Sequence, residues 1–122
     1  MADNTLEVVF NATIFFRIIY ALSAWGGFIT AHNRSRVDKV LSKAKRYRYC
    51  SKLPTFDELL ERADSILFRK AQCNSHCLNS ILPSVRLCTT TLRERGHPYS
   101  LPICKFELFK KSFINRSLFK YM

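Results

Sequence analysis

Three short runs of this sequence place cationic side chains next to aromatic rings, a combination that suits binding of nucleic acid. The runs are KAKRYRY at 43–49, RERGHPY at 93–99 and FKKSFINR at 109–116. Cations neutralise phosphates, and exposed rings stack on unpaired bases. We expect two sets of cations to contact the phosphate backbone of the nucleic acid. The main contacts come from Lys39, Lys43, Lys45, Arg46 and Arg48. Additional contacts come from Arg93, Arg95, Lys110, Lys111 and Arg116.

The net charge supports this interpretation. The chain has 122 residues and a formal charge of +11, which is concentrated in residues 32–52 (net +7) and 81–122 (net +6). Clustered positive charge favours a polyanionic partner, either nucleic acid or an anionic membrane surface. An apolar content of 48% argues against disorder throughout, and five cysteines argue against a closed disulfide framework. Free thiols point to a reducing, intracellular compartment.

The sequence contains no recognisable pattern of catalytic residues. Three glycines, Gly26, Gly27 and Gly96, cannot form a glycine-rich phosphate loop. The adjacent acids Asp57 and Glu58 are better explained as first-turn residues of a helix than as metal ligands. We therefore expect a non-enzymatic chain that needs no cofactor.

A zinc site is a weaker alternative. Cys73 and Cys77 are four residues apart, on one face if the segment is helical, and His97 and Cys104 follow downstream. Thiolates and imidazoles are the usual zinc ligands, but this spacing matches no standard zinc finger. Free cysteines that pack as small apolar residues are the simpler interpretation.

The spacing of apolar residues predicts the elements that position these groups. Helices are expected at 6–24, ended by Gly26 and Gly27, and at 33–49. A third is expected at 55–82, with Thr55 and Glu58 as a capping box and a possible break near Asn74. Residues 83–105 read as a loop, and 107–121 read as a C-terminal helical segment.

The predicted fold is therefore all-α, an irregular bundle of three to four helices with a loop-rich C-terminal third. We divide the chain into segments 1–52, 53–82 and 83–122 of one incomplete domain. The first helix is expected to be buried against the 55–82 helix, with Arg17 at its edge. Residues 8–31 are also apolar enough for a membrane anchor. Asn11 and Arg17 argue against that alternative, because placing an arginine at the centre of a bilayer costs roughly 2.5–3.5 kcal/mol.

Several blocks, in this order, resemble the region after the polymerase core of non-LTR (LINE-type, jockey-like) retrotransposon reverse transcriptases. They cover about residues 5–121. In sequence they read YALSAWGGF at 20–28, KAKRY at 43–47, DELLERAD at 57–64, ILP at 81–83, LRERGHPYSLP at 92–102 and FKKSFINR at 109–116.

The resemblance implies that the helix ending at Trp25 belongs to a thumb that grips template–primer duplex, and that the rest is a helical extension. The catalytic palm of such enzymes would precede residue 1 and would be the natural packing partner. Because palm and fingers are lacking, no catalytic residue is carried over, and we expect Met1 to begin a truncated reading frame. The resemblance implies a nuclear or cytoplasmic location.

Overall fold

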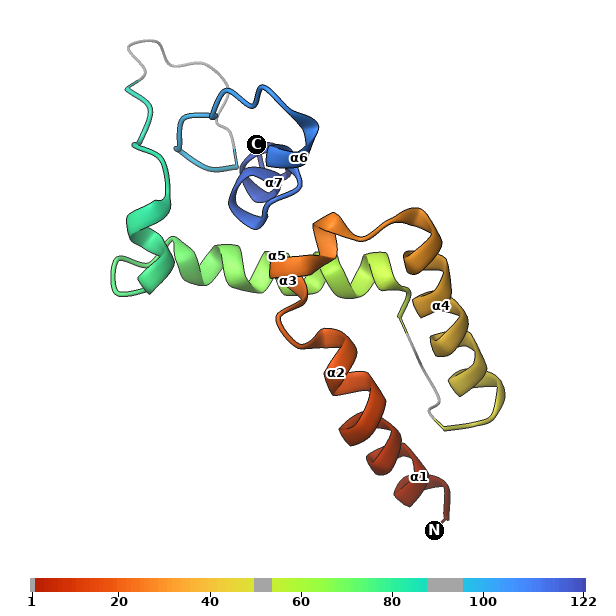
Figure 1. Cartoon of the computed structure of the whole chain (residues 1–122). Helices are drawn as coiled ribbons and strands as arrows, with labels where there is room; N and C mark the ends of the chain where they lie inside the picture. Colours follow the sequence, from red (N-terminus) through yellow and green to blue (C-terminus); the bar gives the residue numbers. More distant parts are fainter. Residues whose placement is uncertain (1, 50–53, 88–95) are drawn as a thin grey trace. The chain divides into compact units, whose positions relative to one another are not determined.

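The computed structural model describes residues 2–49, 54–87 and 96–122 (Figure 1). The predicted all-α class is confirmed: the described residues contain helices and loops and no β-strand, only an isolated antiparallel bridge between Val85 and Tyr99. They form more helices, and shorter ones, than the three or four expected. The chain divides into two compact units, Met1–Ala63 and Asp64–Met122.

The N-terminal helix is interrupted, so the single helix predicted at 6–24 is wrong. Helix α1 (Ala2–Phe10) continues through the π-helical turn η1 (Asn11–Phe15) into α2 (Phe16–Ile19). The chain then changes direction at Ala21, which has the left-handed backbone conformation (φ 49°). Helix α3 (Leu22–Trp25) follows, and the Trp25 indole donates to the carbonyl that the break frees at Tyr20 (2.9 Å).

The α1–α2 stretch is only partly buried, and not buried along its length as predicted. Among residues 5–20, Phe10 is the one buried side chain, and Phe15, Ile18 and Ile19 are partly buried against the core. The exposed apolar side chains are Leu6, Val8, Val9, Ile14, Phe16 and Tyr20. Among the described residues no single helix is long and apolar enough to cross a bilayer. The segments Thr5–Ile19 and Leu22–Phe28 reach that length and composition only together, with a 40° bend between them.

The core of the first unit lies where α3, α4 and α5 meet. Helix α4 spans Ala31–Arg46 and α5 spans Phe56–Ala71, the latter entering the second unit at Asp64. Leu22, Leu41 and Phe56 are at most 3% exposed, and Trp25 packs against the Phe56 ring (5.8 Å between centroids). The predicted packing of the first apolar segment against the third helix is thus confirmed: α3 supplies the buried Leu22, and Phe15, Ile18 and Ile19 of the preceding stretch pack against the same core. The 3-10 turn η2 (Gly26–Phe28) begins with a glycine because a Cβ there would collide with the Leu60 side chain.

The predictions for α4 and α5 agree with the structure in place, but not in length. Helix α4 begins two residues earlier than predicted and ends three earlier. The Thr55 hydroxyl accepts from the Glu58 N–H (3.4 Å), as the capping box predicted. Helix α5 ends at Ala71, so the alternative of a break near Asn74 agrees with the structure and a helix continuous to 82 is wrong. The Asn79 amide caps this end by donating to the carbonyls of Ala71 (3.1 Å) and Gln72 (3.4 Å).

The second unit packs around Phe68 and Leu118, both at most 4% exposed. After α5 come the 3-10 turn η3 (Cys77–Ile81) and two short helices, α6 (Glu107–Lys110) and α7 (Phe113–Lys120). The Phe68 ring stacks on Tyr121 (5.4 Å between centroids). The C-terminal segment predicted at 107–121 is helical but divided.

Candidate nucleic-acid interface

Helix α4 is anchored in the first unit at its N-terminus, through Asp38 and along its inner face. The Thr30 hydroxyl caps its N-terminus by accepting from the Asn33 N–H (3.3 Å). The Asp38 carboxylate accepts from the Phe56 N–H (2.9 Å), which ties α4 to the start of α5. Leu41 and Ala44 are each 3% exposed and anchor the helix in the core. The outward side of α4 is therefore a preorganised surface.

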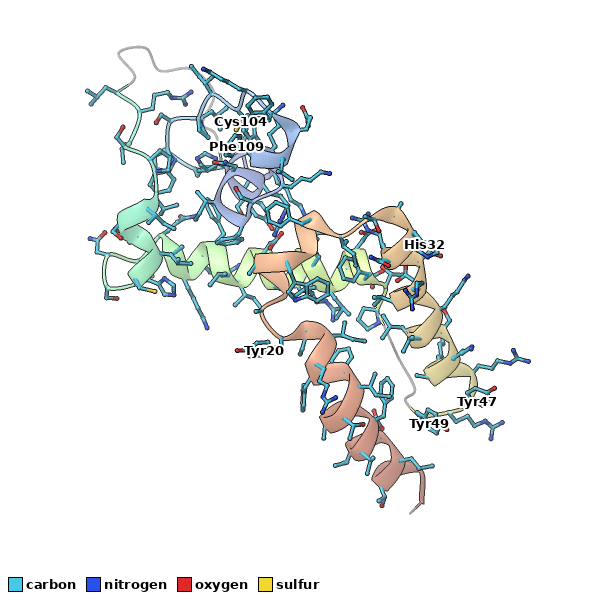
Figure 2. The ribbon with its side chains drawn as sticks, viewed as in Figure 1. Tyr20, His32, Tyr47, Tyr49, Cys104 and Phe109 are labelled. Carbon is cyan, nitrogen blue, oxygen red and sulfur yellow. The ribbon has the colours of Figure 1, made fainter. Side chains whose placement is uncertain are left out.

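Four cations line that outward side, and we name them the basic face: Arg36, Lys39, Lys43 and Arg46, all exposed. At 100° per residue they fall within about 80° of one another around the helix axis, on the side opposite Leu41. His32, also exposed, extends the same line at the N-terminal end (Figure 2). From His32 to Arg46 the line is about 21 Å long at 1.5 Å per residue.

Two residues predicted from the sequence lie off this face. Lys45 projects from the other side of α4, where it lines a small pocket with Asp38 and Thr55. Arg48 follows the helix and has the left-handed backbone conformation (φ 60°). It closes a Schellman turn, in which its own N–H bonds to the Lys45 carbonyl (3.1 Å) and the Tyr49 N–H bonds to the Ala44 carbonyl (2.9 Å).

The nearby acids do not neutralise the basic face. The Asp38 carboxylate is bonded to the Phe56 N–H, and Asp57 pairs with Arg34 (3.1 Å), whose guanidinium also lies over the Phe56 ring. The salt bridges seen between described residues, Arg34–Asp57 among them, do not involve the basic face. The basic face keeps its charge available to a ligand.

The C-terminal cations are arranged differently. The Arg116 guanidinium donates twice to the Asp64 carboxylate (2.9 and 2.8 Å) and once to the Lys111 carbonyl (2.6 Å), so it serves the fold of the second unit. Lys110 pairs with Glu107 (3.5 Å) and lies over the Phe119 ring, while Lys111 is exposed. Arg93 and Arg95 lie outside the described residues.

The residues considered for zinc do not gather into a site. His97 is 2% exposed, and its Nδ1 accepts from the Tyr99 N–H (3.2 Å) while its Nε2 is 2.7 Å from the Leu118 carbonyl oxygen. Since a carbonyl only accepts, Nε2 donates, and both ring nitrogens are used by the fold. Cys73 and Cys77 are exposed free thiols. No three His, Cys, Asp or Glu side chains in the described part of the chain are close enough to hold one metal ion.

Arg36 and His32 were missed as site residues when the sequence was read as runs of charge. The signal that finds them is helical spacing, because positions 32, 36, 39, 43 and 46 are separated by alternating steps of four and three residues.

Comparison of the chain with protein-family models, curated proteins and solved structures finds no match.

Proposed function

We propose that this chain binds the phosphate backbone of nucleic acid through the basic face of α4, without catalysis and without sequence preference. The observation that carries the proposal is the alignment of Arg36, Lys39, Lys43 and Arg46 on one exposed side of a helix that is anchored in the core of the first unit. The resemblance of the sequence to reverse transcriptases supports the further proposal that the chain is a non-catalytic part of an RNA-directed DNA polymerase, with template–primer as its ligand.

Cation–phosphate contacts release condensed counterions, so their number is measurable from the salt dependence of binding. Four contacts predict a slope of log K against log salt of about −3.6 for duplex. Binding should then weaken roughly 150-fold between 50 and 200 mM salt. Phosphates carry no sequence information, so duplexes of different sequence should bind alike.

The test is fluorescence anisotropy with a labelled DNA duplex and an RNA–DNA hybrid over that salt range. The Lys39→Ala/Lys43→Ala variant should lower the slope to about −1.8, so that its affinity falls only roughly 12-fold over the same range. The Lys45→Ala/Lys70→Ala variant is the matched control, since it removes the same charge from exposed positions off the basic face. It should keep a slope near that of the native chain.

Two results would contradict the proposal: no binding at 50 mM salt, or an equal loss of slope in both double variants. The second would mean that net charge, and not the basic face, attracts the nucleic acid. The polymerase origin has a separate test, translation of the DNA upstream of Met1. A Tyr/Phe-x-Asp-Asp palm motif there supports it, and an unrelated upstream region contradicts it.

The exposed apolar side chains of α1–α2 favour a second candidate function, binding to an anionic membrane surface. A groove of about 520 Å³ between α2 and α4 has apolar residues such as Ile14 and Val40 in its walls, and its polar residues include Arg17 and Arg36. Apolar side chains inserted at the acyl boundary and cations at the headgroups are the usual combination of an interfacial helix.

Sedimentation with phosphatidylcholine vesicles, with and without phosphatidylserine, tests this candidate. The Val8→Asp/Val9→Asp variant should lose binding to the anionic vesicles, because both side chains are more than half exposed on α1. Ile103→Asp changes an apolar residue of the second unit that is even more exposed (94%) and should bind as the native chain does. Native protein that stays in the supernatant with both vesicle types would rule the candidate out.

A further inference from the structure

We propose that Tyr47 and Tyr49, at the C-terminal end of the basic face, form a stacking platform for unpaired bases, so that the preferred ligand contains a single-stranded segment. This inference rests on the proposed function and names the ligand class of the same helix. Both tyrosines lie together where α4 ends, whereas Tyr20 lies at the break after α2 (Figure 2).

Three aromatic rings form a ladder from the core to solvent. Phe10 is 5% exposed and packs with Ala44, and the Tyr49 ring stacks on it (6.3 Å between centroids, 20° between planes). The Tyr47 ring lies against Tyr49 (6.1 Å, 39°). Exposure rises along the ladder, from 39% at Tyr49 to 61% at Tyr47. The Tyr47 ring is supported by the Tyr49 and Phe10 rings behind it. A base that stacks on Tyr47 therefore loses little binding free energy to ordering of the Tyr47 side chain.

The turn after α4 makes this ladder possible. The Schellman turn at Arg48 reverses the chain, so that Tyr49 returns toward Ala44 and Phe10. A non-glycine residue in the left-handed conformation carries a strain that glycine would avoid. The position is nevertheless kept by the two turn hydrogen bonds, which hold Tyr49 next to Phe10.

The platform and the basic face are continuous. Tyr47 follows Arg46 directly, and at 100° per residue it lies about 40° around the axis from Lys43. A strand whose phosphates contact the basic face therefore has its bases within reach of Tyr47. In a duplex the base faces are covered by their neighbours, whereas in a single strand they are free to stack.

The test compares three labelled ligands: a thymidine dodecamer, an abasic dodecamer with the same phosphates, and a fully paired duplex. The native chain should bind the thymidine strand roughly 5- to 150-fold more tightly than the abasic strand, the range expected for one stacked base. Tyr47→Ala should remove that difference, whereas Tyr47→Phe should keep it, because stacking needs the ring and not the hydroxyl.

Tyr20→Ala is the matched control, since Tyr20 is 79% exposed and lies away from the basic face. It should bind all three ligands as the native chain does, and Tyr47→Ala should bind the duplex within twofold. Far-UV circular dichroism of each variant checks the fold. Equal, salt-dependent affinity of the native chain for the thymidine and abasic strands would overturn the stacking platform but leave backbone binding intact. No binding to any ligand would overturn both proposals.

Discussion

The basic side chains of α4 and those of α6 and α7 belong to the same residue types, but the surrounding structure uses them differently. On α4 the basic face is exposed, and the acids nearby are bonded to other groups. In the second unit, Arg116 is joined to a carboxylate that is 2% exposed, and Lys110 pairs with its neighbour Glu107. A charge run in the sequence thus has two outcomes, a surface for a ligand or a set of internal contacts. The difference lies in whether a carboxylate is within reach of the cation, as Asp64 is for Arg116 and Glu107 is for Lys110.

The largest expected effect is on stability, from Arg116→Ala. The substitution leaves Asp64 buried without its partner, which should lower the free energy of unfolding by about 3 kcal/mol. Urea denaturation followed by circular dichroism measures this. Lys111→Ala is the control, an exposed neighbour whose loss should change stability by less than about 0.5 kcal/mol. An Arg116→Ala variant as stable as the native chain but weaker in nucleic-acid binding would reverse the comparison.

The next effect is on binding, from Arg36→Ala. Loss of one phosphate contact on the basic face should weaken duplex binding roughly 8-fold at 0.1 M salt, because each contact contributes about 0.9 to the salt slope. Stability should stay unchanged, since Arg36 is exposed. Anisotropy titrations and urea denaturation separate the two quantities. Unchanged affinity would remove Arg36 from the interface.

A smaller effect, of opposite sign, is expected from Arg48→Gly. Glycine adopts φ 60° without the Cβ clash, so the free energy of unfolding should rise by about 0.5–1 kcal/mol. Ala21→Gly is a matched variant at the other left-handed residue among the described residues of the first unit and should also stabilise. Thermal melts of both variants measure this. A lower melting temperature for Arg48→Gly would show that the arginine side chain makes a stabilising contact of its own.

The smallest effect is expected from Lys110→Ala. Exposed salt bridges contribute little, so stability should change by less than about 0.5 kcal/mol. Duplex affinity should change less than twofold, because the Lys110 ammonium is already paired. A larger loss of affinity in the anisotropy assay would show that α6, in addition to the basic face, contacts the nucleic acid.

Local sequence patterns predicted part of this molecule well. The periodicity of apolar residues located α4 and α5, and the Thr55–Glu58 spacing located the start of α5, because these signals act within one or two helical turns. Four of the cations expected on or near α4 are on that helix, and three of them, Lys39, Lys43 and Arg46, belong to the basic face. The helical spacing also contained Arg36 and His32, although reading by charge runs passed over them.

Other features depended on residues distant in the sequence. The end of α5 depends on the Asn79 side chain, eight residues beyond Ala71. The role of Arg116 depends on Asp64, 52 residues away. The break at Ala21 has no strong local signal, since alanine favours helix, yet it allows α3 to bury Leu22 in the core and to pack Trp25 against Phe56.

The sequence by itself determined that the chain is helical, strongly basic and without a recognisable catalytic pattern, because composition and short-range spacing control these properties. Only the tertiary structure decided which cations are free and which are used, which apolar segment enters the core, and that Phe10, Tyr49 and Tyr47 form one ladder. The physical reason is that partner choice is non-local. Burial and hydrogen bonding between segments override local preference when a distant group offers a better contact.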